Sequence, residues 1–149
     1  MENVWAIICE KSSIDSQSNL LSLFNCIEEI KIEIDKEKMP QNDKIVIPIN
    51  LQIISLWLVK DFTKNNSCEI KLELIDPTGK ALNEFINVLQ VAKGEKRMRN
   101  ITNVQGLQIT EEGRYYYKIS QKKSDKFVEV AKLPLDVNLS YKIFDIPRQ

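Results

Sequence analysis

The sequence predicts an all-β protein, an antiparallel β-sandwich of about eight to nine strands in one domain that spans residues 1–149. Short apolar segments recur at regular intervals, turn residues separate them, and no stretch carries a long, unambiguous helical period. The chain is 43% hydrophobic and 28% charged, which is ordinary for a soluble globular domain. Its length is sufficient to bury a core without a disulfide or a metal.

The first quarter of the chain is predicted to form two strands. Residues 4–10 are a short apolar run and give the first strand, and the polar residues 11–19 give a loop. Residues 20–27 are apolar on both faces and lead into β-branched alternation over residues 30–34, so we predict one strand with a bulge where the phase shifts. A helix over residues 20–30 is the competing interpretation, because its apolar positions also fit one helical face.

The most apolar part of the chain covers residues 45–59 and contains a proline. Pro48 has no N–H to give to a central ladder, so we predict an edge-like piece over residues 45–49 and a core strand over residues 52–59. Trp57 is the large residue that this strand is expected to place in the core. Charged or polar loops are predicted on either side, at residues 35–44 and 60–67.

A hairpin is predicted next. Residues 70–74 alternate between apolar and charged types, and residues 76–79 have the order Asp-Pro-Thr-Gly of a type I turn, which Asp76 is expected to cap. The return arm over residues 80–91 also fits a helical spacing, but the turn chemistry favours a strand. Later strands are predicted at residues 100–109, 127–135 and 137–146, with a polar loop at residues 121–126.

The strongest local signal is a tight corner within residues 107–119. After the corner at Gly113, the alternate residues Tyr115 and Tyr117 share the apolar face of a strand. The spacing Ile109-x3-Gly113-x-Tyr115 is that of a tyrosine corner, in which a Tyr near the start of a strand bonds back to the preceding turn. We therefore expect Tyr115 to be buried and the sandwich to be immunoglobulin-like.

The corner spacing is similar to that of fibronectin type III domains, which also lack the immunoglobulin disulfide, although Glu111 stands where those domains often have proline. Three motifs together resemble a bacterial family of small immunoglobulin-like β-sandwich proteins of unknown function: Ile75-Asp-Pro-Thr-Gly79, Glu112-Gly-Arg-Tyr115 and Leu133-Pro-Leu-Asp-Val137. The resemblance covers most of the chain and implies the sandwich fold. It brings no catalytic, cofactor or ligand residues with it.

The residue types that most catalytic and metal sites need are missing. The chain has no histidine, which excludes Ser-His-Asp and Cys-His nucleophiles and removes the commonest zinc ligand. It has no C-x-x-C motif and no glycine-rich phosphate loop. The carboxylate pairs at residues 28–29 and 111–112 are adjacent, so in a strand the two members of each pair point to opposite faces. We therefore predict no enzymatic activity, no cofactor and no metal site.

The one local concentration of charge is a basic segment that contains Lys93, Lys96, Arg97 and Arg99. With a formal net charge of +0 the whole chain has no general attraction to nucleic acid or anionic membranes, and no aromatic residues are interleaved for base stacking. A solvated loop or a guarded sheet edge is the expected role, and contact with phosphates is the alternative. Tyr116, on the face opposite the buried tyrosines, is the better candidate for a surface contact.

The start of the chain has no basic segment before its short apolar run, so no secretory signal is predicted. The three cysteines, Cys9, Cys26 and Cys68, are expected to be reduced, and a single disulfide stays an open alternative. A cytoplasmic location follows from these two expectations.

The function predicted from the sequence is a non-catalytic protein-binding or self-associating module that acts through strand edges and end loops. One alternative is a structural subunit of a larger assembly such as a phage particle or a secretion machine. The other is a weak nucleic-acid or small-ligand binder that uses the basic segment over residues 93–99. Because unrelated functions occur on β-sandwiches, the fold does not choose among these.

Overall fold

The computed structural model describes residues 1–35 and 44–142, and within them it contains nine strands and no helix, which confirms the all-β class. Residues 36–43 of the predicted loop and residues 143–146 of the predicted last strand lie outside the described residues. The strands are β1 (Glu2–Ile14), β2 (Leu21–Cys26), β3 (Glu29–Asp35), β4 (Ile45–Leu58), β5 (Asn66–Ile75), β6 (Ala81–Val91), β7 (Arg97–Ile109), β8 (Gly113–Lys123) and β9 (Lys126–Lys142).

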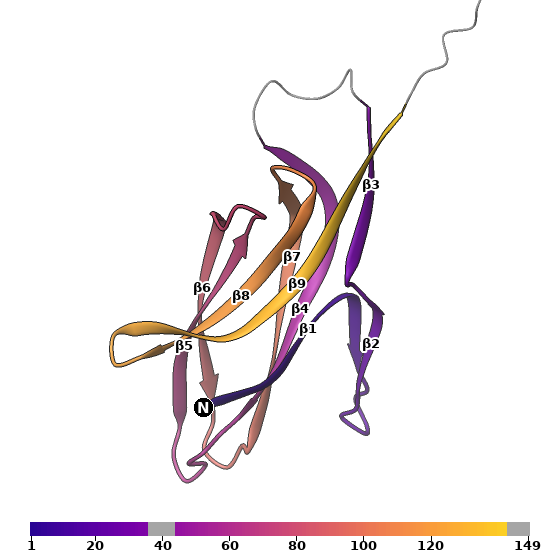
Figure 1. Ribbon diagram of the computed structural model, residues 1–149. Coiled ribbons are helices and arrows are strands. Elements are labelled where there is room, and N and C mark those ends of the chain that lie inside the picture. Colours follow the sequence, from indigo (N-terminus) through magenta and orange to yellow (C-terminus); the bar gives the residue numbers. More distant parts are fainter. Residues whose placement is uncertain (36–43, 143–149) are drawn as a thin grey trace, which may run out of the picture.

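The strands form two sheets, one with the order β2-β1-β4-β7 and one with the order β3-β9-β8-β5-β6. All pairs are antiparallel except β3 with β9, which is parallel. Figure 1 shows β9 running along the molecule from its hairpin with β8 to its pairing with β3. This arrangement of two sheets is consistent with the predicted β-sandwich.

One hydrophobic core draws side chains from both sheets. Trp57 from β4 and Tyr115 from β8 are its largest members, and neither exposes any surface. The indole Nε1 of Trp57 donates a hydrogen bond to the Ser55 hydroxyl at 2.8 Å, so the one polar atom of this ring is satisfied inside the core. Trp57 and Tyr115 are therefore buried, as the sequence predicts.

The predicted single strand over residues 20–34 is wrong, because the chain changes sheet within it. β2 pairs with β1 in the four-stranded sheet, whereas β3 pairs with β9 in the five-stranded sheet. Ile27 donates its N–H to Ile8 in the first sheet, and the carbonyl of the next residue, Glu28, accepts the N–H of Asp136 in the second, both at 2.9 Å. The shift in apolar phase therefore marks a crossing and not a bulge.

The split predicted at Pro48 is also wrong, since β4 is one strand. Its register with β7 shifts between Ile47 and Asn50, which accommodates the missing N–H. Opposite this irregularity Gly106 has a φ of 78°, and a Cβ there would lie 3.0 Å from a methyl group of Val46. The edge-like character does hold, because β1 pairs with β4 only from Gln52 onward.

Two strands are longer than the sequence predicts, and one ambiguous segment is a strand as predicted. β1 extends to Ile14 through part of the predicted loop, because its polar second half pairs with β2 from Cys9↔Cys26 to Ile14↔Leu21. The two strands predicted over residues 127–146 are joined as far as they are described, because β9 leaves its pairing with β8 and enters that with β3 without a break. The strand preferred for the arm after the Asp-Pro-Thr-Gly turn is confirmed as β6.

Candidate interaction surface

The two lysines of the basic segment lie in the turn between β6 and β7, and both are exposed. The Nζ atom of Lys96 is 5.4 Å from the centroid of the Phe62 ring, and the Lys96 carbonyl accepts the Val59 N–H at 3.0 Å. Lys93 and Lys96 thus belong to a turn, whereas the two arginines of the segment stand on a strand.

The two arginines stand at the start of β7, opposite Leu58 and Leu56 of β4. Arg99 Nη1 donates to the carbonyl of Asn19 at 2.9 Å, so the turn between β1 and β2 engages this guanidinium. Arg97 is exposed and lines a shallow hollow beside Arg99. The predicted segment is therefore divided, and only its second half brings two cations together.

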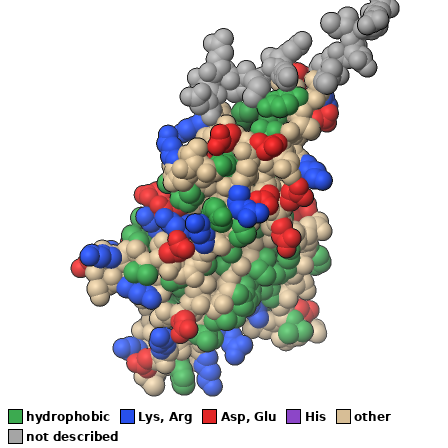
Figure 2. All heavy atoms as spheres, in the orientation of Figure 1, with side chains coloured by type: hydrophobic (Ala, Val, Ile, Leu, Met, Phe, Trp, Pro, Cys, Tyr) green, Lys and Arg blue, Asp and Glu red, His purple; other side chains and the backbone are tan. Residues whose placement is uncertain are grey.

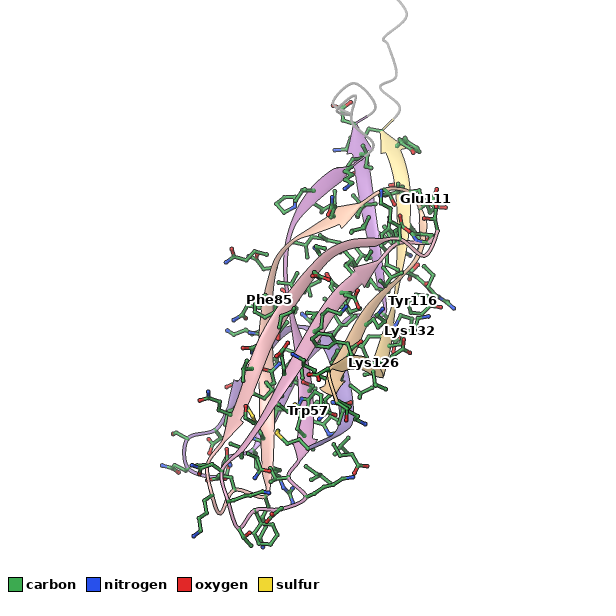
Figure 3. All side chains as sticks on the ribbon, turned by 90° about the vertical axis from the view of Figure 1, so that its left-hand side faces the viewer. Trp57, Phe85, Glu111, Tyr116, Lys126 and Lys132 are labelled. Atoms are coloured by element: carbon green, nitrogen blue, oxygen red, sulfur yellow. The ribbon has the colours of Figure 1, made fainter. Side chains whose placement is uncertain are left out.

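Tyr116 lies on β8 opposite Pro134, partly buried, and Lys132 Nζ stands 4.2 Å from its ring centroid (Figure 3). A cation already occupies one face of the ring, which leaves less of Tyr116 for a partner than the sequence predicts.

The same sheet carries a set of mutually paired charges. Glu73 is 7% exposed and lies 2.9 Å from Lys118 Nζ and 3.3 Å from Lys71 Nζ. Although its partial burial acts to raise the pKa of Glu73, the two ammonium groups lower it overall. Glu73 therefore pairs with both lysines on this face of the sheet.

One carboxylate from each adjacent pair reaches a common hollow, which the sequence did not indicate. Glu29 and Glu112 line it together with Asp136. Each of the three is already engaged: Asn138 donates to Glu29, the Leu139 N–H donates to Glu112 at 2.7 Å, and Arg114 pairs with Asp136. Across residues 1–35 and 44–142, no group of three or more acidic or cysteine side chains is arranged to hold a metal ion.

The hydroxyl of Tyr115 ties the β7–β8 corner together. It accepts the N–H groups of Thr110 at 2.9 Å and Glu111 at 3.1 Å, and it donates to the Glu111 carbonyl at 2.7 Å. At Gly113 the φ is 146°, and a Cβ would lie 2.9 Å from the ring of Pro77 in the β5–β6 turn. The corner and the Asp-Pro-Thr-Gly turn are therefore packed against each other.

Polar contacts extend this cluster. Asp76 accepts the N–H groups of Thr78 and Lys80, both at 2.9 Å, and its second oxygen lies 3.3 Å from the Thr110 hydroxyl. The Thr78 hydroxyl contributes most to holding the pKa of the Asp76 carboxyl below its usual range. Arg114 binds Asp136 through two bonds of 2.6 and 2.9 Å, which lowers the pKa of that carboxyl. The three motifs of the sequence thus meet at one end of the fold and hold it together.

Besides the edge strands β2, β7, β3 and β6, two inner strands lack a neighbour on one side over part of their length, as far as the structure describes the chain. β2 pairs with β1 only from Cys9 onward and Ile27 bonds the Ile8 carbonyl, so residues 2–7 of β1 have β4 alone. β3 pairs with β9 only from Asp136 onward, so residues 126–135 of β9 have β8 alone. Sequence reasoning did not identify this feature, because it depends on where each ladder begins.

A groove of about 460 Å³ lies between β1 and β9 at one end of these two edges, where residues 26–28 cross from one sheet to the other. Its walls include Ile7, Ile27 and Leu133, and the Arg114–Asp136 ion pair stands at its border. Figure 2 shows a band of hydrophobic side chains on this face, between β9 and the β1–β2 region. On the same two stretches Val4 and Val128 are exposed by 49% and 44%.

No family model and no curated protein matches this sequence. Within the part of the chain that the structure describes, no helix could cross a membrane.

Proposed function

We propose that this protein is a non-catalytic binding module that takes up an extended segment of another protein, or of a second copy of itself, in the groove between β1 and β9. The observation that carries the proposal is the pair of strand edges that border the groove, residues 2–7 of β1 and residues 126–135 of β9. Main-chain N–H and C=O groups on such edges are what strand addition uses for affinity.

The side chains of the groove suggest what the added segment looks like. Its walls are mainly apolar, so alternate residues of the segment are apolar and face inward. An extended chain rises about 3.3 Å per residue in either strand, so about six residues cover the free stretch of β1. The Arg114–Asp136 pair at the border favours a polar residue at one end of the segment.

We further propose that the sandwich is immunoglobulin-like with a tyrosine corner at Tyr115. The three backbone hydrogen bonds of its hydroxyl and the close approach of Gly113 to Pro77 support this assignment. The assignment concerns architecture and selects no partner.

A reducing, cytoplasmic compartment also fits the cysteines. Cys9, Cys26 and Cys68 are all free thiols, and Cys9 faces Cys26 directly across the β1–β2 pair. Thiols so close together persist unbridged where glutathione and thioredoxin keep cysteines reduced.

The test compares the native protein with a variant in which both exposed edge valines become lysine, Val4→Lys and Val128→Lys. Charges on an edge strand oppose the addition of another strand, and substitutions at exposed positions leave stability nearly unchanged. Leu20→Lys is the matched control, since Leu20 is 66% exposed and lies in the turn between β1 and β2.

Light scattering on a sizing column and affinity capture from the native cell give the readouts. We expect self-association or a captured partner with the native chain and the control, and its loss with the double variant. A native protein that stays monomeric and captures nothing, or a partner that the double variant holds equally well, would refute the proposal.

A further inference from the structure

Strand β6 forms the outer edge of the five-stranded sheet (Figure 1), and β5 is its one neighbour within the described part of the chain. Edge strands usually carry lysine, proline or a bulge, which stops them from pairing with another chain. Between Asn83 and Val91 the strand has none of these three, and Glu84 is its one charged residue. One side of β6 is therefore open to the addition of a further strand.

Both faces of this edge carry exposed hydrophobic side chains. Phe85, Ile86 and Val88 are exposed by 53%, 48% and 49%. Phe85 stands opposite the core residue Leu72 and so shares the core-side face of the sheet, as Figure 3 shows for its place on β6. Ile86 and Val88 belong to the other face, because successive side chains of a strand alternate. A strand added to this edge would cover apolar surface on both faces.

The hydrogen bonds of β6 show which of its backbone groups point outward. The Val88 N–H donates to Oδ1 of Asn87 at 2.8 Å, so a neighbouring side chain takes up this N–H and not the ladder with β5. Backbone N–H and C=O groups alternate between the two sides of an antiparallel strand. Glu84 and Ile86 therefore also direct their backbone groups to the open side.

This set of positions is complementary to itself. When two copies of β6 pair antiparallel about a two-fold axis at Ile86, Ile86 faces its own counterpart and Glu84 of each copy faces Val88 of the other. All of these residues direct their backbone groups outward, so donors and acceptors of the two strands meet in register. On the core-side face Phe85 lies diagonal to Phe85 of the second copy, a separation that aromatic rings can bridge.

The charge of Glu84 selects this register over its neighbours. An axis at Glu84 would set two carboxylates directly opposite each other, which is destabilising, and an axis at Val88 would set Ile86 opposite the polar Gln90. With the axis at Ile86 the carboxylate faces a neutral residue. It also keeps a cation of its own copy, since Lys71 Nζ is 3.9 Å away.

We propose that two copies of this chain dimerise through β6, antiparallel and centred on Ile86, so that their five-stranded sheets become one continuous sheet. Strand β6 stands at the opposite end of its sheet from β3 and β9 and has no residue in the groove between β1 and β9. The dimer therefore does not depend on the role proposed for that groove. A dimer that survives the substitutions at Val4 and Val128 belongs to β6, and the groove is then tested by the captured partner alone.

Sedimentation velocity over a concentration series measures the dimer of the full chain. Residue 86 faces itself, so Ile86→Lys and Ile86→Glu each set equal charges opposite each other, and each variant alone should be monomeric. An equimolar mixture of the two variants should dimerise again, because opposite charges then meet. Leu20→Lys, which adds a lysine at an exposed position in the turn between β1 and β2, is the control and should dimerise like the native chain.

Disulfide trapping tests the register in a Cys26→Ser background, which removes the exposed native thiol. Ile86→Cys should cross-link to the second copy, because facing residues of this kind have Cα atoms about 5.5 Å apart. Val88→Cys should not, because the two copies of residue 88 are offset by about 13 Å along the strands. A native chain that is monomeric throughout the series, a mixture of the Lys and Glu variants that stays monomeric, or Val88→Cys cross-linking more readily than Ile86→Cys would each overturn the proposal.

Discussion

Replacing Tyr115 and Tyr117 by phenylalanine removes one oxygen from each of two buried side chains that lie on the same face of β8. The Tyr115 hydroxyl makes three hydrogen bonds to backbone groups, of 2.7 to 3.1 Å. The Tyr117 hydroxyl makes none within the described residues. The two substitutions are equal in size and hydrophobicity, so the difference between them isolates the hydrogen bonds.

For Tyr115→Phe the expected loss is worked from the bonds. A net contribution of about 0.5–1.5 kcal/mol for each of three bonds gives a loss of about 2–4 kcal/mol in the free energy of unfolding. In a chain of this length that lowers the melting temperature by roughly 4–16 °C. For Tyr117→Phe no bond is lost and the cost of burying an unpaired hydroxyl disappears, so stability should rise by about 1 kcal/mol.

Urea denaturation followed by circular dichroism, with linear extrapolation, measures both values, and an unchanged m-value shows that both variants unfold from the same native state. The reasoning is refuted if the two variants lose the same stability. It is also refuted if Tyr117→Phe is the more destabilised of the two, since its hydroxyl would then have a partner, such as an ordered water.

Three other changes test the fold. Mild oxidation with diamide should join Cys9 and Cys26, which face each other across β1 and β2, and the disulfide should lower the mass by about 2 Da. Closing a loop of this length should raise the free energy of unfolding by about 3 kcal/mol. Cys26→Ser should abolish both the mass change and the gain in stability. Folding lowers the pKa of the Asp76 carboxyl, so its contribution to stability is present above about pH 4 and is lost as the pH falls through the pKa of the folded state. Asp76→Asn should therefore make the free energy of unfolding depend less steeply on pH at acid pH. An unchanged acid slope would contradict this. Gly113→Ala should lower the melting temperature, because the added Cβ would meet Pro77 at 2.9 Å. Gly79→Ala is the control: a Cβ there has nothing within 4 Å, so this variant measures the cost of a positive φ alone. Equal losses of melting temperature in the two variants would contradict the proposed clash.

The local sequence pattern was sufficient to predict a strand where buried apolar residues alternate with exposed polar ones. The alternation over residues 70–74 and the following turn predicted β5, the turn and β6, and the spacing around Gly113 predicted a buried Tyr115. These features depend on contacts between residues close in sequence, so the sequence carries them directly.

The candidate surfaces show the limit of the same reasoning. Charge clustering in the sequence identified the basic segment, but the structure divides it, since the turn between β1 and β2 engages Arg99. No local pattern indicated the groove between β1 and β9. It lies where two strands lack a neighbour, which follows from where each ladder begins and ends.

By itself the amino-acid sequence determined that this chain is built of strands, where most of them turn, and which large side chains form the core. Only the tertiary structure decided that residues 27–28 carry the chain from one sheet to the other, and therefore which strand edges remain unpaired. The physical reason is that a bulge within one sheet and a crossing between two sheets produce the same shift in the apolar pattern of the sequence. Pairing partners that are about a hundred residues apart distinguish the two cases.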